Sequence, residues 1–143
     1  MPWLGTLTII GLAVTAVLVW IYLKFRSHDV LEAIAVKRRA SSKIVTEAAY
    51  VEGLEKIAVI VALTDEAFYY ENADLQASLD ISQIDEVEYD DETATGHAVA
   101  SGRALRIRSH GHCFEFILTT GDANKWEAIL PAHHENASHA RAV

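Results

Sequence analysis

Residues 3–23 read WLGTLTIIGLAVTAVLVWIYL and contain no charged side chain. Sixteen of these 21 positions are apolar. Twenty-one helical residues span about 31 Å, which matches the roughly 30 Å hydrocarbon core of a bilayer. A helix also satisfies its backbone hydrogen bonds internally, as a bilayer requires. The stretch therefore predicts a single transmembrane helix over residues 3–23, with enough chain after it for one small domain.

The residues at both ends of this stretch are typical of a membrane anchor. Trp3 lies at one end, and Trp20 and Tyr22 lie at the other, where amphipathic rings favour the headgroup region. Lys24 and Arg26 follow directly. A cleaved signal peptide is the alternative, but no basic residue precedes the apolar stretch, which is longer than the apolar region of a typical signal peptide.

Charge divides the 143-residue chain, whose formal net charge is −8, into two parts. Residues 1–43 carry six basic and two acidic side chains, and residues 44–143 carry six and eighteen. The positive-inside rule predicts an outer N-terminus and a cytoplasmic C-terminal domain at the inner (cytoplasmic) membrane. The single cysteine, Cys113, agrees with a reducing compartment, and we expect it to be half-buried and structural. This charge pattern argues against a polytopic transporter and against a nucleic-acid binder.

Residues 24–43 form a basic juxtamembrane linker that has features of a short helix. We expect that helix to run from Val30 to Ala40, with Ser27 as its N-cap and Lys37–Arg39 in its last turn. Its apolar face is only partial, and the basic residues favour a position close to anionic headgroups.

Residues 44–131 predict a mainly-β cytoplasmic domain of six or seven antiparallel strands followed by a helix. Ile57–Leu63 is typical of a buried strand, and later segments alternate between apolar and polar residues. Residues 44–55 fit either a strand or a short helix. Asp122 is expected to cap a final helix that carries Trp126 and ends before Pro131. We expect residues 132–143 to be a disordered tail.

The order of these segments resembles the bacterial pleckstrin-homology-like group, which includes PH and GRAM domains. The resemblance lies in ALTDEAFYY (62–70), LDISQIDEV (79–87) and the Trp126 helix, within residues 44–131. It is a match of order and pattern and contains no sharp motif. It implies a PH-like barrel that is capped by the C-terminal helix and binds lipid headgroups, peptides or proteins without catalysis.

Arg103, Arg106 and Arg108 form the single ridge of positive charge in this acidic domain and are its candidate binding residues. Two interpretations stay open. The ridge is either an anion site or a set of cross-strand ion pairs with Glu86, Glu88 or Glu115. Residues 65–92 hold eleven acidic side chains and no basic one, which argues against phosphoinositide recognition.

The sequence favours no catalytic, metal or cofactor site. His110, His112 and Cys113 cluster at a predicted hairpin, but no second spaced pair of ligands completes a zinc site. His97, His133 and His134 are the other candidate donors for that site. The acidic run over residues 85–92 lacks the glycine turn of a calcium loop. No nucleophile motif or phosphate loop is recognisable.

These observations predict a single-pass, membrane-tethered, non-catalytic module that binds a protein partner at the cytoplasmic membrane face. The alternative is a weak lipid-headgroup module that uses the arginines from Arg103 to Arg108. Gly11 and Thr15 form one small-xxx-small pair in the anchor, so a homodimer is a further possibility.

Overall fold

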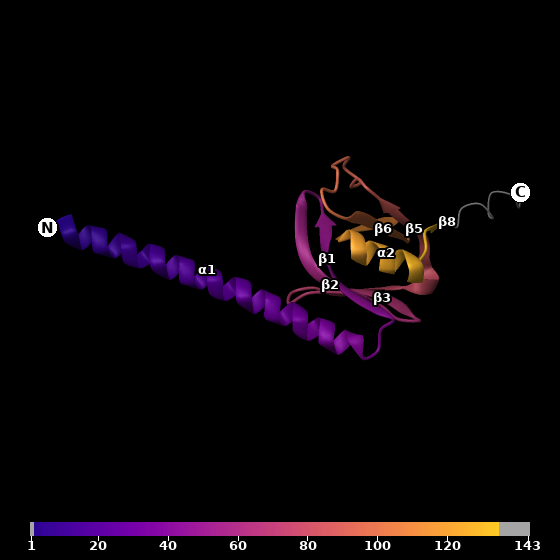
Figure 1. Ribbon diagram of the computed structural model, residues 1–143, viewed down its shortest axis with the longest axis horizontal. Helices are drawn as coiled ribbons and strands as arrows, with labels where there is room; N and C mark the ends of the chain where they lie inside the picture. Colours follow the sequence, from indigo (N-terminus) through magenta and orange to yellow (C-terminus); the bar gives the residue numbers. More distant parts are fainter. Residues whose placement is uncertain (1, 135–143) are drawn as a thin grey trace, which may run out of the picture.

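One unbroken helix, α1 (Pro2–Arg39), opens the chain in a computed structural model that describes residues 2–134 (Figure 1). The helix expected after Ser27 is therefore not a separate element. The Ser27 hydroxyl donates to the Lys24 carbonyl at 2.9 Å within α1, so its prediction as an N-cap is wrong. Residues 24–39 contain no proline or glycine that would break the helix.

Among residues 2–134, α1 is the one helix that is long and apolar enough to cross a membrane. Its most apolar window has a mean hydropathy of 2.3, and none of that window is buried within the protein. The side chains of Trp3, Trp20 and Tyr22 are exposed, and Lys24 Nζ lies 5.2 Å from the centre of the Trp20 ring. An N-terminal signal sequence meets the same criteria of length and composition.

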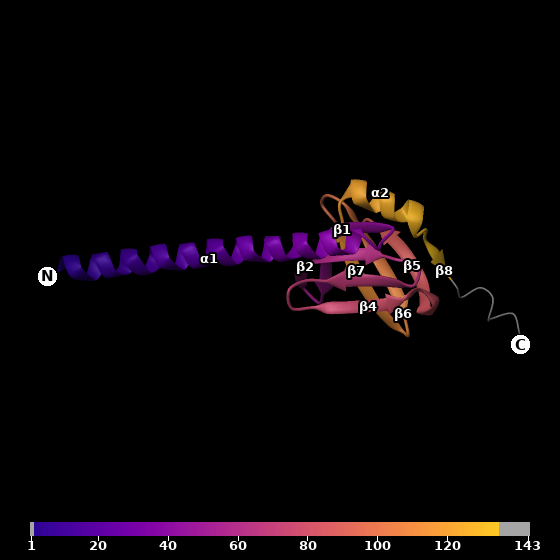
Figure 2. The same ribbon diagram turned by 90° about the horizontal axis from the view of Figure 1, so that it is seen from below.

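Eight antiparallel strands form one curved, open sheet after α1 (Figures 1 and 2). They are β1 (Ile44–Glu52), β2 (Glu55–Leu63), β3 (Ala67–Glu71), β4 (Gln76–Asp80), β5 (Ile84–Asp90), β6 (Arg103–Ser109), β7 (His112–Leu118) and β8 (His133–His134). Their order in the sheet is β4-β3-β2-β1-β7-β6-β5-β8. The two meanders join where residues 49–51 of β1 pair with residues 115–117 of β7.

The expectation of a barrel of six or seven strands needs two corrections. The sheet is open, with β4 and β8 at its edges, because one turn of 3-10 helix (Ile81–Gln83) separates β4 from β5 in place of a hairpin. The eighth strand, His133–His134, lies in the predicted tail and pairs with Glu86 and Val87. The rest of that tail, residues 135–143, lies outside the described residues. Residues 44–52, left open between strand and helix, form β1.

A second helix, α2 (Thr120–Ile129), packs on the sheet and completes the core (Figure 2). Its N-cap is Thr119, whose hydroxyl accepts from the Asp122 amide at 3.3 Å, so the prediction of Asp122 as the cap is wrong. Trp126 is fully buried, as its amphipathic spacing predicts, and its indole Nε1 donates to Thr46 Oγ1 at 2.8 Å. The aromatic core around it consists of Phe68, Tyr70 and Phe116.

The last turns of α1 pack against the outer face of the sheet. Leu31 and Ala35 form a small buried cluster with Ile60 of β2. Arg38 donates two hydrogen bonds to the carboxylate of Glu71 on β3, from Nε at 2.8 Å and from Nη2 at 2.5 Å. Its guanidinium also lies 3.9 Å from the centre of the Tyr69 ring. These contacts join α1 directly to the domain, whereas the sequence predicted a separate linker between them.

The Glu71→Gln variant is expected to loosen this junction. The hydrogen bonds from Arg38 hold the pKa of Glu71 below its usual range, and charge-assisted bonds of this kind are worth about 1.5–3 kcal/mol. Amide exchange over residues 31–38 of the full chain should therefore become faster in the variant at neutral pH. The conservative Glu66→Gln variant, at an exposed turn, is the control and should exchange as wild type does.

The same pair predicts a dependence on acid. A carboxyl group with a lowered pKa contributes its stability above the ordinary glutamate range and loses it as the pH falls below that range and through the lowered value. A spin label on cysteine at Val36, with Cys113 changed to serine, should gain mobility in that range. Equal mobility from neutral pH to pH ~3 would contradict the pH dependence expected of this pair.

Gly102 is required by a close approach between two backbone segments. Its φ is +143°, and a Cβ there would lie 2.0 Å from the carbonyl oxygen of Leu118. We expect Gly102→Ala to lower the free energy of unfolding by about 1–3 kcal/mol. Gly121→Ala is the control, because its Cβ would meet nothing within 4 Å. Equal denaturation midpoints for the two variants would contradict this role for Gly102.

Candidate binding surface on strand β6

The three candidate arginines do not form one ridge. Side chains alternate between the two faces of a strand, so Arg106 and Arg108 share the outer face of β6. Arg103 lies on the opposite face, where its guanidinium is 5.6 Å from the centre of the Tyr89 ring. The sequence interpretation of a single ridge overlooked this parity, because positions 103 and 106 are an odd number of residues apart.

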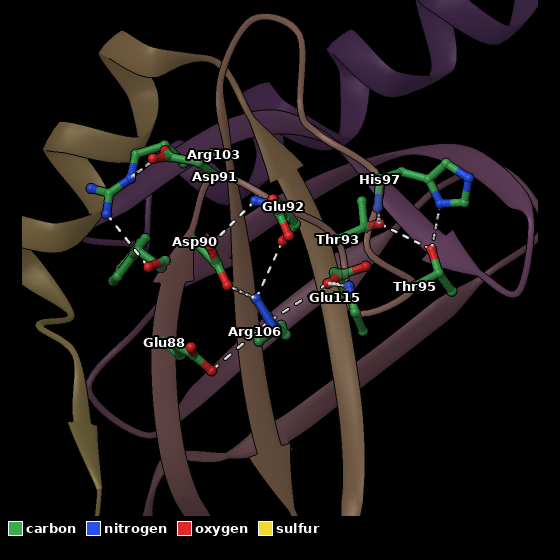
Figure 3. A network of polar contacts seen from close by, with 12 residues as sticks. Glu88, Asp90, Asp91, Glu92, Thr93, Thr95, His97, Arg103, Arg106 and Glu115 are labelled. Carbon is green, nitrogen blue, oxygen red and sulfur yellow. Dashed lines mark hydrogen bonds and ion pairs between the residues drawn. The ribbon is translucent and has the colours of Figure 1, made fainter.

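Arg106 is the centre of a polar network that ties the loop after β5 to the sheet (Figure 3). Its Nη2 pairs with Asp90 Oδ2 and donates to the Glu92 carbonyl at 3.2 Å. Its Nε lies 3.6 Å from Glu115 Oε2, and that buried carboxylate accepts from the Ala94 amide at 2.8 Å. One arginine thus neutralises carboxylates on both neighbouring strands and holds residues 92–94 in place.

The other two arginines are also paired with carboxylates. Arg103 Nη1 donates to Glu127 Oε2 of α2 at 2.8 Å, and its Nε lies 3.8 Å from Asp91 Oδ1. Arg108 Nε lies 3.5 Å from Glu86 Oε2. The cross-strand pairs are therefore present in the structure. An anionic ligand at this surface would have to compete with carboxylates that are already in contact with every guanidinium of the set.

The histidines and the cysteine are dispersed over the domain. His97 Nδ1 lies 2.9 Å from Thr95 Oγ1, His110 Nε2 lies 2.8 Å from Gln83 Oε1, and His134 Nδ1 lies 2.9 Å from Glu86 Oε1. No group of three or more metal-ligating side chains gathers within the part of the chain that the structure describes.

Cys113 is exposed, which corrects its prediction as a half-buried thiol. It lies near the start of β7, opposite Arg108. Desolvation by its neighbours raises the pKa of the thiol, so the reactive thiolate is disfavoured at neutral pH. Its position makes it a single native site for labelling.

The open edge of β4 is the second candidate surface. β4 pairs with β3 on one side and forms the border of the sheet on the other. Its Gln76, Ser78 and Asp80 are exposed, and Asp74 lies in the turn before it. A strand edge offers backbone donors and acceptors to an added strand, and here it carries acidic side chains at both ends.

Two features of the structure, one ion pair and one buried carboxylate, were not predicted from the sequence. The Arg38–Glu71 pair was missed because Arg38 was interpreted as part of a topology signal, although Leu31, Ala35 and Arg38 repeat at helical spacing. The buried position of Glu115 was missed because its burial depends on the loop that folds over it.

No family model matches this chain, and no curated protein or solved structure matches it. The function is therefore inferred below from the geometry and charge of the chain itself.

Proposed function

We propose that this protein is a single-pass, membrane-tethered, non-catalytic module whose acidic domain binds a protein partner at the cytoplasmic membrane face. The observation that carries this proposal is the acidic, uncovered edge of β4 on a domain packed against its own anchor helix. A partner with an extended, basic segment fits this edge by strand addition and by charge.

The charge of the domain supports a basic partner. Residues 44–143 carry eighteen acidic and six basic side chains, and Arg103, Arg106 and Arg108 are already in ion pairs. The surplus of carboxylates steers a positively charged partner toward the domain at low ionic strength. The same surplus repels phosphate, so the lipid-headgroup alternative gains no support from these arginines.

A PH-like fold is part of the proposal. Two antiparallel meanders of four and three strands, joined through β1 and β7 and covered by a C-terminal helix, follow the order expected of that group. The two-residue strand β8 and the open border at β4 are the departures from it.

Site-specific photo-crosslinking tests the partner surface. A photoreactive amino acid at Ser78, on the exposed edge of β4, is expected to give a discrete protein adduct in native membranes, and high salt should weaken it. The control position is Lys125, exposed on α2. Adducts of equal yield at both positions, or none at Ser78 even at low salt, would contradict the proposal.

Protease accessibility tests the orientation. We expect protease added to inverted membrane vesicles to digest the domain, because the basic residues after the apolar stretch favour a cytoplasmic C-terminus. Digestion in intact cells with protection in inverted vesicles would place the domain on the opposite side.

A further inference from the structure

The turn between β1 and β2 presents an apolar side chain to solvent. Gly53 and Leu54 form this two-residue turn between the paired Glu52 and Glu55, and Gly53 has a φ of +63°. Leu54 is 90% exposed, the highest value among the large apolar side chains of residues 3–134. An exposed leucine alone is ordinary on a protein surface, so its surroundings decide whether it has a role.

The neighbouring loop is uncharged. Residues 93–101, TATGHAVAS, contain no aspartate, glutamate, lysine or arginine, although residues 44–143 as a whole carry a net charge of −12 with histidine neutral. This loop and the β1–β2 turn line one cavity of about 300 Å³, which includes Leu54, His97 and Val99. We call the turn 53–54 and the loop 93–101 together the apolar rim.

The contacts of α1 place this rim near the C-terminal end of the apolar stretch, at Leu23. The β3–β4 turn lines a cavity with Val30 of α1, only seven residues, or about 10 Å, after Leu23. Ile60 of β2 pairs with Glu71, the last residue of β3. From Ile60, β2 continues for five more residues to its first residue, Glu55, at the β1–β2 turn, which is about 17 Å of strand. In both views the β1–β2 turn lies on the side of the domain nearer the N-terminus of α1 (Figures 1 and 2).

We propose that the apolar rim contacts the same bilayer that α1 crosses, with Leu54 inserted at the boundary between headgroups and acyl chains. This inference rests on the proposed membrane span and not on its orientation. The headgroup layer extends about 5–7 Å beyond the hydrocarbon core. The part of β2 between Ile60 and the β1–β2 turn is long enough to reach this layer, even when the strand is inclined to α1. The packing of Leu31 and Ala35 and the Arg38–Glu71 pair hold the domain in this position.

The charges around the rim define the kind of contact. Glu52 and Glu55 flank Leu54, and Lys56 is the one lysine or arginine that lines the rim's cavity. An apolar contact flanked by two carboxylates is expected on zwitterionic lipid and should weaken as anionic lipid is added. A phosphate-binding contact through Lys56 would have the opposite dependence.

Depth-dependent quenching in lipid nanodiscs tests the contact with the full chain. An environment-sensitive fluorophore is placed on cysteine at Leu54 in a Cys113→Ser background, in phosphatidylcholine with nitroxide quenchers near the headgroups. A label on cysteine in place of Lys125, in the same background, is the control, because this exposed residue of α2 lies beside Trp126, which contacts Thr46 at the end of β1 away from the rim. A label at Leu12, within the apolar stretch, reports the span itself.

The expected result is a loss of fluorescence and a blue shift at positions 54 and 12, with neither change at 125. A label at Val99 should also lose quenching in the Leu54→Asp variant and keep it in Ile129→Asp, whose site is exposed elsewhere on the domain. Quenching at 12 without quenching at 54 would overturn the rim contact and leave the span intact. No quenching at 12 would overturn both, and stronger quenching at 54 on anionic lipid would assign the contact to phosphate.

Discussion

Replacing Trp126 by alanine is expected to lower the free energy of unfolding of the domain by about 3–5 kcal/mol. The indole is fully buried and packs edge-on against Phe68, with ring centres 5.6 Å apart. Its removal leaves a cavity beneath α2 and deprives Thr46 of the hydrogen bond from Nε1. The measurement is denaturant unfolding of the full chain in detergent, followed by far-ultraviolet circular dichroism.

Two variants separate packing from hydrogen bonding at this site. Trp126→Phe keeps most of the apolar contact and should cost less than the alanine variant, with about 1 kcal/mol of its loss due to the missing hydrogen bond. Ile129→Ala removes a side chain that is 40% exposed on the same helix and should have a small effect. A Trp126→Ala variant as stable as Ile129→Ala would contradict the assignment of α2 to the core.

Replacing Arg106 by glutamine is expected to cost about 3–5 kcal/mol, because it leaves the buried carboxylate of Glu115 without its charge partner. The loop that Arg106 holds through the Glu92 carbonyl should loosen at the same time. Hydrogen exchange over residues 92–99 measures the loop, and denaturant unfolding measures the stability.

Arg108→Gln is the matched control for Arg106. Its side chain is 54% exposed and its pair with Glu86 lies at the surface, so we expect a cost below about 1 kcal/mol. The double variant Arg106→Met, Glu115→Met should recover much of the loss, because it removes both buried charges. Similar losses in the Arg106→Gln and Arg108→Gln variants would show that the network around Arg106 has no special structural role.

Much of the architecture was predictable from local patterns. The charge-free stretch over residues 3–23 indicated a long apolar helix, and alternation over residues 75–81, 105–108 and 113–118 indicated strands that the structure confirms. Trp126 at helical spacing indicated a buried contact for the last helix, and this contact is present. These features depend on neighbours in sequence, which is why the sequence was sufficient for them.

The features that the sequence analysis missed depend on contacts between distant segments. The open border of the sheet follows from the path between β4 and β5, and β8 forms only because β5 offers a partner for His133 and His134. The continuity of α1 was missed because Ser27 fits an N-cap as well as a helix interior. The division of the arginines between two faces required the exact register of β6.

The central claim is that α1 and the acidic domain form one body through the contacts of Leu31, Ala35 and Arg38. A distance between spin labels at Cys113 and at cysteine in place of Val19, measured by pulsed dipolar spectroscopy in nanodiscs, tests it most directly. We predict a single narrow distance distribution for wild type and a broader one for Glu71→Gln. A broad distribution in both proteins would contradict the claim and show that α1 moves freely relative to the domain.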